Sequence, residues 1–227
     1  MVRPSIPRGL ARFLRHEVRI ELRRPTALAG LVLYVLSSVF VLYFMLTYND
    51  AGPLTPVIWA SFFWLIMVYT AVSSATRSMF DAGDGLRLYY HQLLTPVVYI
   101  LGKLVFNVLL TGVLMAVSLV VYTVVLGTPG IPVVRFVPAV VLGAAGFSLL
   151  FTLVSGIAAR AEGNAVLSVV LGFPLSVPLM IYATRISRGF LTPETAVNLG
   201  RDIGILCAFD AVIAALAIVL FPYIWRD

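Results

Sequence analysis

Long runs without a charged residue dominate the pattern of this chain. Five of these runs exceed the roughly 20 residues that an α-helix needs to cross a bilayer, and a sixth is interrupted only by Asp210. The runs cover residues 25–49, 51–76, 104–134, 136–159, 163–184 and 203–225. They predict an all-α, polytopic membrane bundle that forms one domain over residues 1–227. The expected spans lie near 27–48, 54–75, 98–126, 137–159, 164–184 and 203–224.

The composition supports lipid as the solvent of this bundle. Hydrophobic residues make up 61% of the 227 residues and charged residues only 11%, whereas an ordinary soluble domain has roughly 25% charged residues. The net charge of +6 follows from the basic residues near the ends of the runs, which a membrane topology explains without nucleic acid as a partner.

The basic residues also predict the orientation. If the runs are six spans, one side of the membrane receives only four of the 16 lysines and arginines, namely Arg135, Arg185, Arg188 and Arg201. The positive-inside rule then places both termini in the cytoplasm. Three of those four arginines fall in the expected loop 185–201, where a seventh, re-entrant element would overturn the assignment.

Residues 8–24 read as an amphipathic helix that lies flat on the membrane surface. Arginines fall on one stripe of this helix and apolar side chains opposite, while Glu17 and Glu21 project from the middle of the apolar face. Two alternatives remain open for these carboxylates. They are solvated on a frayed helix, or they form structural ion pairs with arginines of the cytoplasmic loops such as Arg77 or Arg160.

The segment 77–96 is the one substantial loop with both charged and aromatic residues. Its acidic and glycine residues predict a turn and a helix N-cap, and the leucines and tyrosines that follow have helical spacing. The segment is therefore either a solvated connector or a cytoplasmic helix on which a soluble partner docks. The residues expected to make that docking contact are Asp81, Asp84, Gly85, Arg87, Tyr89, Tyr90 and His91.

Three features inside the spans bear on packing. Residues 143–146 are all glycine or alanine, which predicts close helix packing or a subunit interface. Pro174 and Pro178 predict a kinked fifth span, either static or part of a moving element. Asp210 is an intramembrane carboxylate, which implies a structural pair or a functional site.

The chain carries no signature of catalysis. HExxH, GxSxG and Walker-type GxxxxGK[ST] sequences are absent, and Cys207 is the only cysteine. We therefore expect no enzyme activity, no bound metal or other cofactor, and no ATP bound by this chain itself.

Three segments resemble the CcmB family, the permease of the cytochrome c maturation ABC transporter of the ABC-2 class. They are residues 16–23 with their glutamate-arginine pattern, residues 80–96 leading into Gly102 and Lys103, and residues 159–164 followed by the proline-rich stretch 172–179. Two positions depart from the family pattern. Arg87 follows Leu86 where members carry an acidic residue, and Glu162 stands where a second basic residue is common.

The resemblance implies a set of partners in the bacterial inner membrane. These are a second copy of this chain, a CcmA-type ATPase that binds ATP, CcmC-type and CcmD-type membrane proteins, and indirectly a periplasmic haem chaperone. ATP hydrolysis would then be coupled to delivery of haem, the handled substrate, or to release of the chaperone. The alternatives are an ABC-2 permease that exports another substrate, such as a lipid-linked glycan or a drug, and a scaffold that works without an ATPase.

Overall fold

The computed structural model describes residues 6–23, 25–48, 52, 54–80, 96–128, 130, 132–161, 164–193 and 198–224. Within this part of the chain all regular structure is helical. The elements in chain order are α1 (Ile6–Leu22), α2 (Pro25–Tyr48), α3 (Pro56–Phe80), α5 (Pro96–Leu126), the short 3-10 helix η1 (Val133–Phe136), α6 (Val137–Ala161), α7 (Ala165–Leu191) and α8 (Leu199–Ile224).

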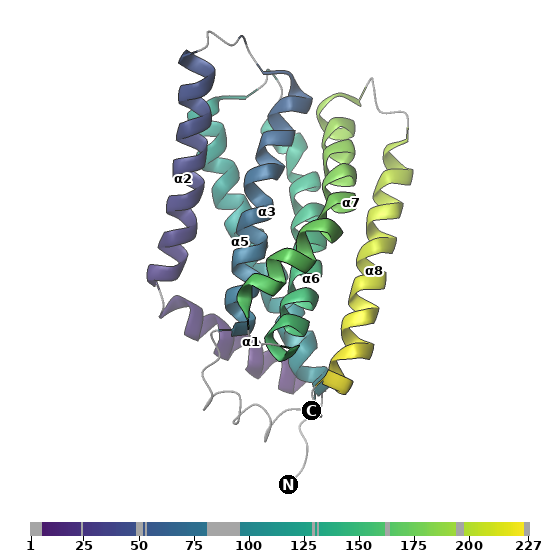
Figure 1. Cartoon of the computed structure of the whole chain (residues 1–227). Coiled ribbons are helices and arrows are strands. Elements are labelled where there is room, and N and C mark those ends of the chain that lie inside the picture. Colours follow the sequence, from purple (N-terminus) through teal and green to yellow (C-terminus); the bar gives the residue numbers. More distant parts are fainter. Residues whose placement is uncertain are drawn as a thin grey trace.

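The predicted all-α membrane bundle is confirmed. Six of the described helices, α2, α3, α5, α6, α7 and α8, are long and apolar enough to cross a membrane. Successive spans run in opposite directions, so the ends of α3, α6 and α8 and the starts of α5 and α7 lie together at one end of the bundle (Figure 1). The amphipathic helix α1 lies across this same end.

Local sequence signals set where the helices begin. Pro25, Pro56 and Pro96 are the first residues of α2, α3 and α5, a position where the missing N–H of proline costs no hydrogen bond. The side chain of Asn164 caps α7 by accepting a hydrogen bond from the backbone N–H of Val166 at 2.9 Å. Gly127 follows α5 with a φ of 72°, which glycine adopts without strain.

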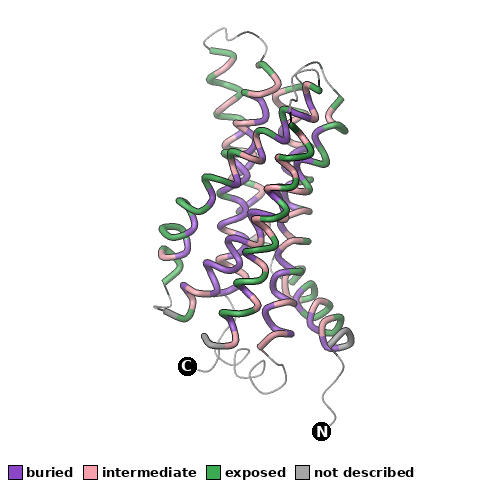
Figure 2. The backbone as a smooth tube through the Cα atoms, turned by 90° about the vertical axis from the view of Figure 1, so that its right-hand side faces the viewer, coloured by how far each residue is buried: buried purple, intermediate pink, exposed green. Residues whose placement is uncertain are grey.

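The helix α6 forms the centre of the bundle and contacts α3, α5, α7 and α8. Its small residues permit this, as the sequence predicted. A methyl group placed on Gly143 would lie 2.2 Å from the ring of Trp64 on α3, and one on Gly146 would lie 2.7 Å from Leu179 on α7. The exposed residues lie mainly on the outer faces of the helices (Figure 2), where lipid would cover them.

The end of α7 differs from the expected loop 185–201. The helix continues to Leu191 and α8 begins at Leu199, so Arg185 and Arg188 belong to the last turns of α7. The expected loop is therefore mostly helix. Pro174 and Pro178 both lie inside α7, which changes direction partway along its length in Figure 1.

Candidate functional site

The helix α1 is held against the bundle by one buried aromatic ring. Phe13 is only 3% exposed and its ring lies directly on Gly102 of α5, where an added methyl group would be 2.4 Å from the ring. The ring also makes an edge-to-face contact with Tyr99, with 5.7 Å between ring centroids. Glycine at position 102 is thus required for α1 to approach α5 this closely.

A buried ion pair lies next to this contact. The Lys103 ammonium donates to Oε2 of Glu17 at 2.9 Å and to the backbone carbonyl of Ser78 at 2.8 Å. The side chains of Lys103 and Glu17 are 3% and 8% exposed. Because a single buried charge is strongly unfavourable, each of these two groups needs the other. The pair joins α1, α3 and α5.

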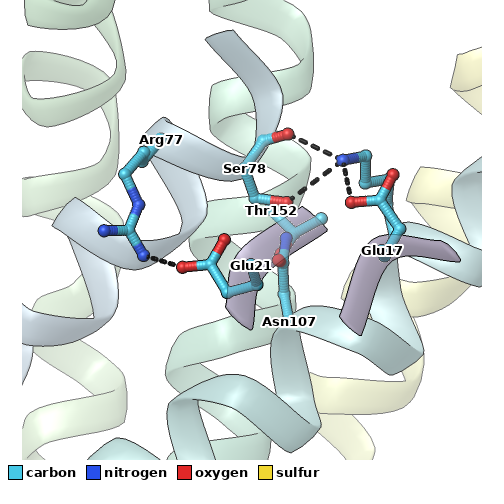
Figure 3. A network of polar contacts seen from close by, with 7 residues as sticks. Glu17, Glu21, Arg77, Ser78, Asn107 and Thr152 are labelled. Carbon is cyan, nitrogen blue, oxygen red and sulfur yellow. Dashed lines mark hydrogen bonds and ion pairs between the residues drawn. The ribbon is translucent and has the colours of Figure 1, made fainter. Parts of the chain in front are cut away.

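A second ion pair joins α1 to the last turn of α3. Nη2 of Arg77 donates to Oε1 of Glu21, and both side chains are 17% exposed. Figure 3 shows the two ion pairs side by side, with both carboxylates presented by α1. Both glutamates therefore have basic partners. Glu21 contacts Arg77, which the sequence named, whereas Glu17 contacts Lys103, which it did not. Arg160 lies exposed at the end of α6.

These two ion pairs flank the segment between α3 and α5. Arg77 is three residues before the end of α3 at Phe80, and Lys103 lies seven residues after the start of α5 at Pro96. The helix that enters the segment and the helix that leaves it are thus both tied to α1. The residues expected to dock a soluble partner all fall outside the described residues: Asp81, Asp84, Gly85, Arg87, Tyr89, Tyr90 and His91.

Comparison with known protein families identifies the chain. The sequence model of the family described as CcmB protein matches residues 8–224, almost the whole length. The chain belongs to the CcmB family. A comparison with individually curated proteins gives no match.

Membership of the CcmB family settles the class of function. The chain is the membrane permease component of a cytochrome c maturation haem exporter and is not itself catalytic. Its family implies an ABC-transporter ATPase, CcmA, as partner. Among the described residues no group of three or more His, Cys, Asp or Glu side chains is arranged to hold a metal ion.

In this CcmB-family chain a polar seam continues from the ion pairs into the bundle. Asn107 of α5 donates to the Thr152 hydroxyl of α6 at 2.9 Å, one helical turn beyond Lys103. Among the described residues of α3, α5 and α6, four buried oxygens have no hydrogen-bond partner: Ser74 Oγ, Asn107 Oδ1, Thr111 Oγ1 and Ser148 Oγ. This contact was not predicted from the sequence. Its signal was an amide and hydroxyls spaced four residues apart within apolar spans.

Asp210 lies where α6, α7 and α8 meet. A methyl group on Gly146 of α6 would be 2.8 Å from Oδ1 of Asp210 and 2.7 Å from Leu179 of α7. This Oδ1 is buried and has no hydrogen-bond partner among the described residues. The glycine at position 146 therefore makes room for the carboxylate inside the bundle.

An aromatic cluster fills the opposite end of the bundle. Trp59, Phe63, Trp64, Tyr122 and Phe136 are all 0–1% exposed and make edge-to-face or stacked contacts with one another. Their polar atoms are satisfied. The indoles donate to Gly127 and Ser187, and the Tyr122 hydroxyl donates to the carbonyl of Trp59. These rings form the core and offer no surface to a planar ligand such as haem.

Proposed function

We propose that this chain works as the mechanical subunit of the exporter, as a single ABC-2 type domain paired with a second copy of itself and with two CcmA-type ATPases. ATP bound and hydrolysed in the partner would drive a rearrangement of the helix bundle. That rearrangement would deliver haem to the periplasmic haem chaperone or release the chaperone. The CcmC-type and CcmD-type membrane proteins would lie alongside, with haem as a handled substrate and not as a bound cofactor.

The proposal includes an orientation in the bacterial inner membrane. The end of the bundle that carries α1, Arg77 and Lys103 faces the cytoplasm, and both termini lie on that side. Support comes from the uneven distribution of basic residues, because the other side receives only four of the 16. All four belong to helices and not to loops: Arg135 to η1, Arg185 and Arg188 to α7 and Arg201 to α8. Asp202 lies 3.8 Å from Arg185.

The two ion pairs of α1 carry the coupling proposal. An ATPase that pushes or pulls on residues 81–95 acts on a segment whose two flanking helices are both fastened to one helix. A movement of this segment would therefore move α3, α5 and α1 together, because the ion pairs join both flanking helices to α1. The segment residues Asp81, Asp84, Gly85, Arg87, Tyr89, Tyr90 and His91 make the ATPase contact in this proposal. Asp210 stays in a structural role within the bundle.

Charge reversal at the Arg77–Glu21 pair tests the proposal. We expect Glu21→Arg to leave the ATPase bound to the purified complex but to reduce ATP-dependent accumulation of c-type cytochromes. Restoring opposite charges with Glu21→Arg and Arg77→Glu together should recover much of that accumulation. A matched control is the same exchange at Arg185 and Asp202, an ion pair at the other end of the bundle, which should change neither readout.

Two results would contradict the coupling proposal. The first is full cytochrome maturation in the Glu21→Arg variant. The second is undiminished co-purification of the ATPase after both Asp84→Lys and Tyr90→Ala, which would place the docking surface outside the segment 81–95.

A further inference from the structure

The helix α1 has three faces, of which the bundle covers only one. Phe13 and Glu17 are buried and Glu21 is mostly covered, and these three residues face α3 and α5. At 100° per residue they occupy about a quarter of the helix circumference. Two other rows of side chains remain exposed, and each row has one chemical character.

The first exposed row is basic. Arg12, Arg15, Arg19 and Arg23 are all exposed. The spacing of three or four residues puts the first three on one side of α1, and Arg23 directly follows the last residue of this helix. The row is on the helix side away from Glu17 and Glu21, so these carboxylates do not neutralise it. Guanidinium groups in such a row match the geometry of phosphate oxygens, to which each can donate two hydrogen bonds.

The second exposed row is apolar and lies beside the first. Leu14, Val18 and Leu22 follow one another at intervals of four residues. Val18 is 45% exposed and Leu22 is 71% exposed, whereas Leu14 is half-buried. The row lies between the basic row and the face that meets the bundle. A water-facing helix would place polar residues here, whereas a helix at the boundary of a bilayer places apolar residues toward the acyl chains.

The position of α1 agrees with that boundary. The helix lies across the end of the bundle where the apolar spans terminate (Figures 1 and 2). Its last residue, Leu22, is three residues before the start of the span α2 at Pro25. A membrane around the six spans would therefore bring lipid headgroups to the level of α1.

We propose that the exposed side of α1 is a binding site for anionic phospholipids. The phosphate groups bind to Arg12, Arg15 and Arg19, and an acyl chain packs along Leu14, Val18 and Leu22. An acidic surface of the soluble ATPase would satisfy the arginines equally well. It would, however, leave the apolar row against water, so the two adjacent rows together favour lipid. This lipid site does not depend on whether the ATPase docks on residues 81–95.

The test measures which lipids the full-length protein retains. The chain is purified in detergent micelles that contain equal amounts of phosphatidylglycerol and phosphatidylcholine, and the bound lipids are quantified by mass spectrometry. We expect a preference for phosphatidylglycerol that falls with rising salt. Replacing Arg12, Arg15 and Arg19 together by Gln should lower this preference by about fivefold for each charge removed. The corresponding Lys variant should retain most of it.

A control variant separates this site from the general charge of the protein. Arg135, Arg188 and Arg201 are also exposed, and replacing them by Gln removes the same charge from the opposite end of the bundle. This control should keep the phosphatidylglycerol preference. Val18→Ser with Leu22→Ser should reduce the total amount of retained lipid. Inorganic phosphate at equal concentration should not displace the lipid, because it lacks an acyl chain.

Three outcomes would overturn the proposal. The first is that the Gln variant of α1 retains the full preference for phosphatidylglycerol. The second is that the control variant loses this preference equally. The third is that free phosphate displaces the lipid as effectively as phosphatidylglycerol does. Retained lipid together with loss of a co-purified ATPase in the α1 variant would assign the arginines to the ATPase instead. Because the three arginines are exposed, all variants should elute as folded protein in size-exclusion chromatography.

Discussion

Removing one member of the Lys103–Glu17 pair should strongly destabilise the protein. Glu17→Gln leaves the ammonium of Lys103 buried with neutral acceptors, the carbonyl and hydroxyl of Ser78 and the amide oxygen of the new glutamine. Lys103→Met leaves the carboxylate of Glu17 in a position that is 6% exposed. In both variants the remaining charge stays within the bundle, where water solvates it poorly.

The magnitude follows from the geometry. Two unit charges at 2.9 Å attract each other by about 6 kcal/mol at an effective dielectric constant of about 20. The loss of solvation of both ions offsets part of this attraction. Removal of one partner from a buried ion pair typically costs about 3–5 kcal/mol. We expect the loss of unfolding free energy in Glu17→Gln to lie near the lower value, because Ser78 still accepts hydrogen bonds from Lys103. The loss in Lys103→Met should lie near the upper value.

A double-mutant cycle is the assay. The free energy of unfolding is measured by titration with SDS in mixed micelles for the wild type, both single variants and the double variant. The double variant should be more stable than the sum of the single losses predicts, by about 2 kcal/mol or more, because neither charge is then left without the other. Additive losses within about 0.5 kcal/mol would refute the coupling between the two residues.

The control for this cycle is a more exposed ion pair. Asp202→Asn removes the partner of Arg185, which is 60% exposed and lies 3.8 Å away. Exposed pairs contribute about 0–1 kcal/mol. Single losses at Lys103 and Glu17 no larger than this control would mean that the buried pair does not hold α1 in place.

Two further predictions concern packing inside the bundle. Gly143→Ala should cost about 1–3 kcal/mol of unfolding free energy, because the methyl group meets Trp64 at 2.2 Å. Gly112→Ala meets nothing within 4 Å and should be neutral or stabilising, so equal effects of the two substitutions would refute the packing argument. Asn107→Leu should cost about 1–3 kcal/mol in the same titration by leaving Thr152 buried without its donor. Adding Thr152→Val should recover part of that loss, and no recovery would contradict the direct contact.

The six spans were predictable because uncharged runs of this length have no other stable environment than a bilayer. Their ends were less predictable. The second expected span ended before Arg77 and the fifth before Arg185, whereas α3 continues to Phe80 and α7 to Leu191. A charged residue does not end a helix at the membrane surface, because a long arginine side chain can extend toward the headgroups while its backbone stays helical.

The partners of the α1 carboxylates depended on information that the sequence does not carry. The helical period predicted that Glu17 and Glu21 lie on the apolar face of α1. It did not predict the direction in which α1 crosses α3 and α5. The expected span 98–126 contained Lys103, but nothing in the sequence indicated that it pairs with Glu17. Because α5 begins at Pro96, Lys103 lies about two turns inside the helix, within reach of Glu17. The contact of Phe13 with Gly102 sets this crossing.

The polar seam was missed for a related reason. A single amide or hydroxyl in an apolar span gives no indication of its partner, and Asn107 and Thr152 come together only when α5 packs antiparallel to α6. Sequence spacing does predict that polar residues four apart share one face of a helix. It does not predict which faces meet.

The most direct test of the central claim is site-specific photo-crosslinking to the ATPase partner in the assembled complex. A photoreactive residue at position 90, in the segment between α3 and α5, should crosslink to the ATPase. The same residue at Val134, an exposed position of η1 at the opposite end of the bundle, should not. Crosslinking from Val134, or none from position 90 while the ATPase co-purifies, would contradict both the orientation and the proposed site of coupling.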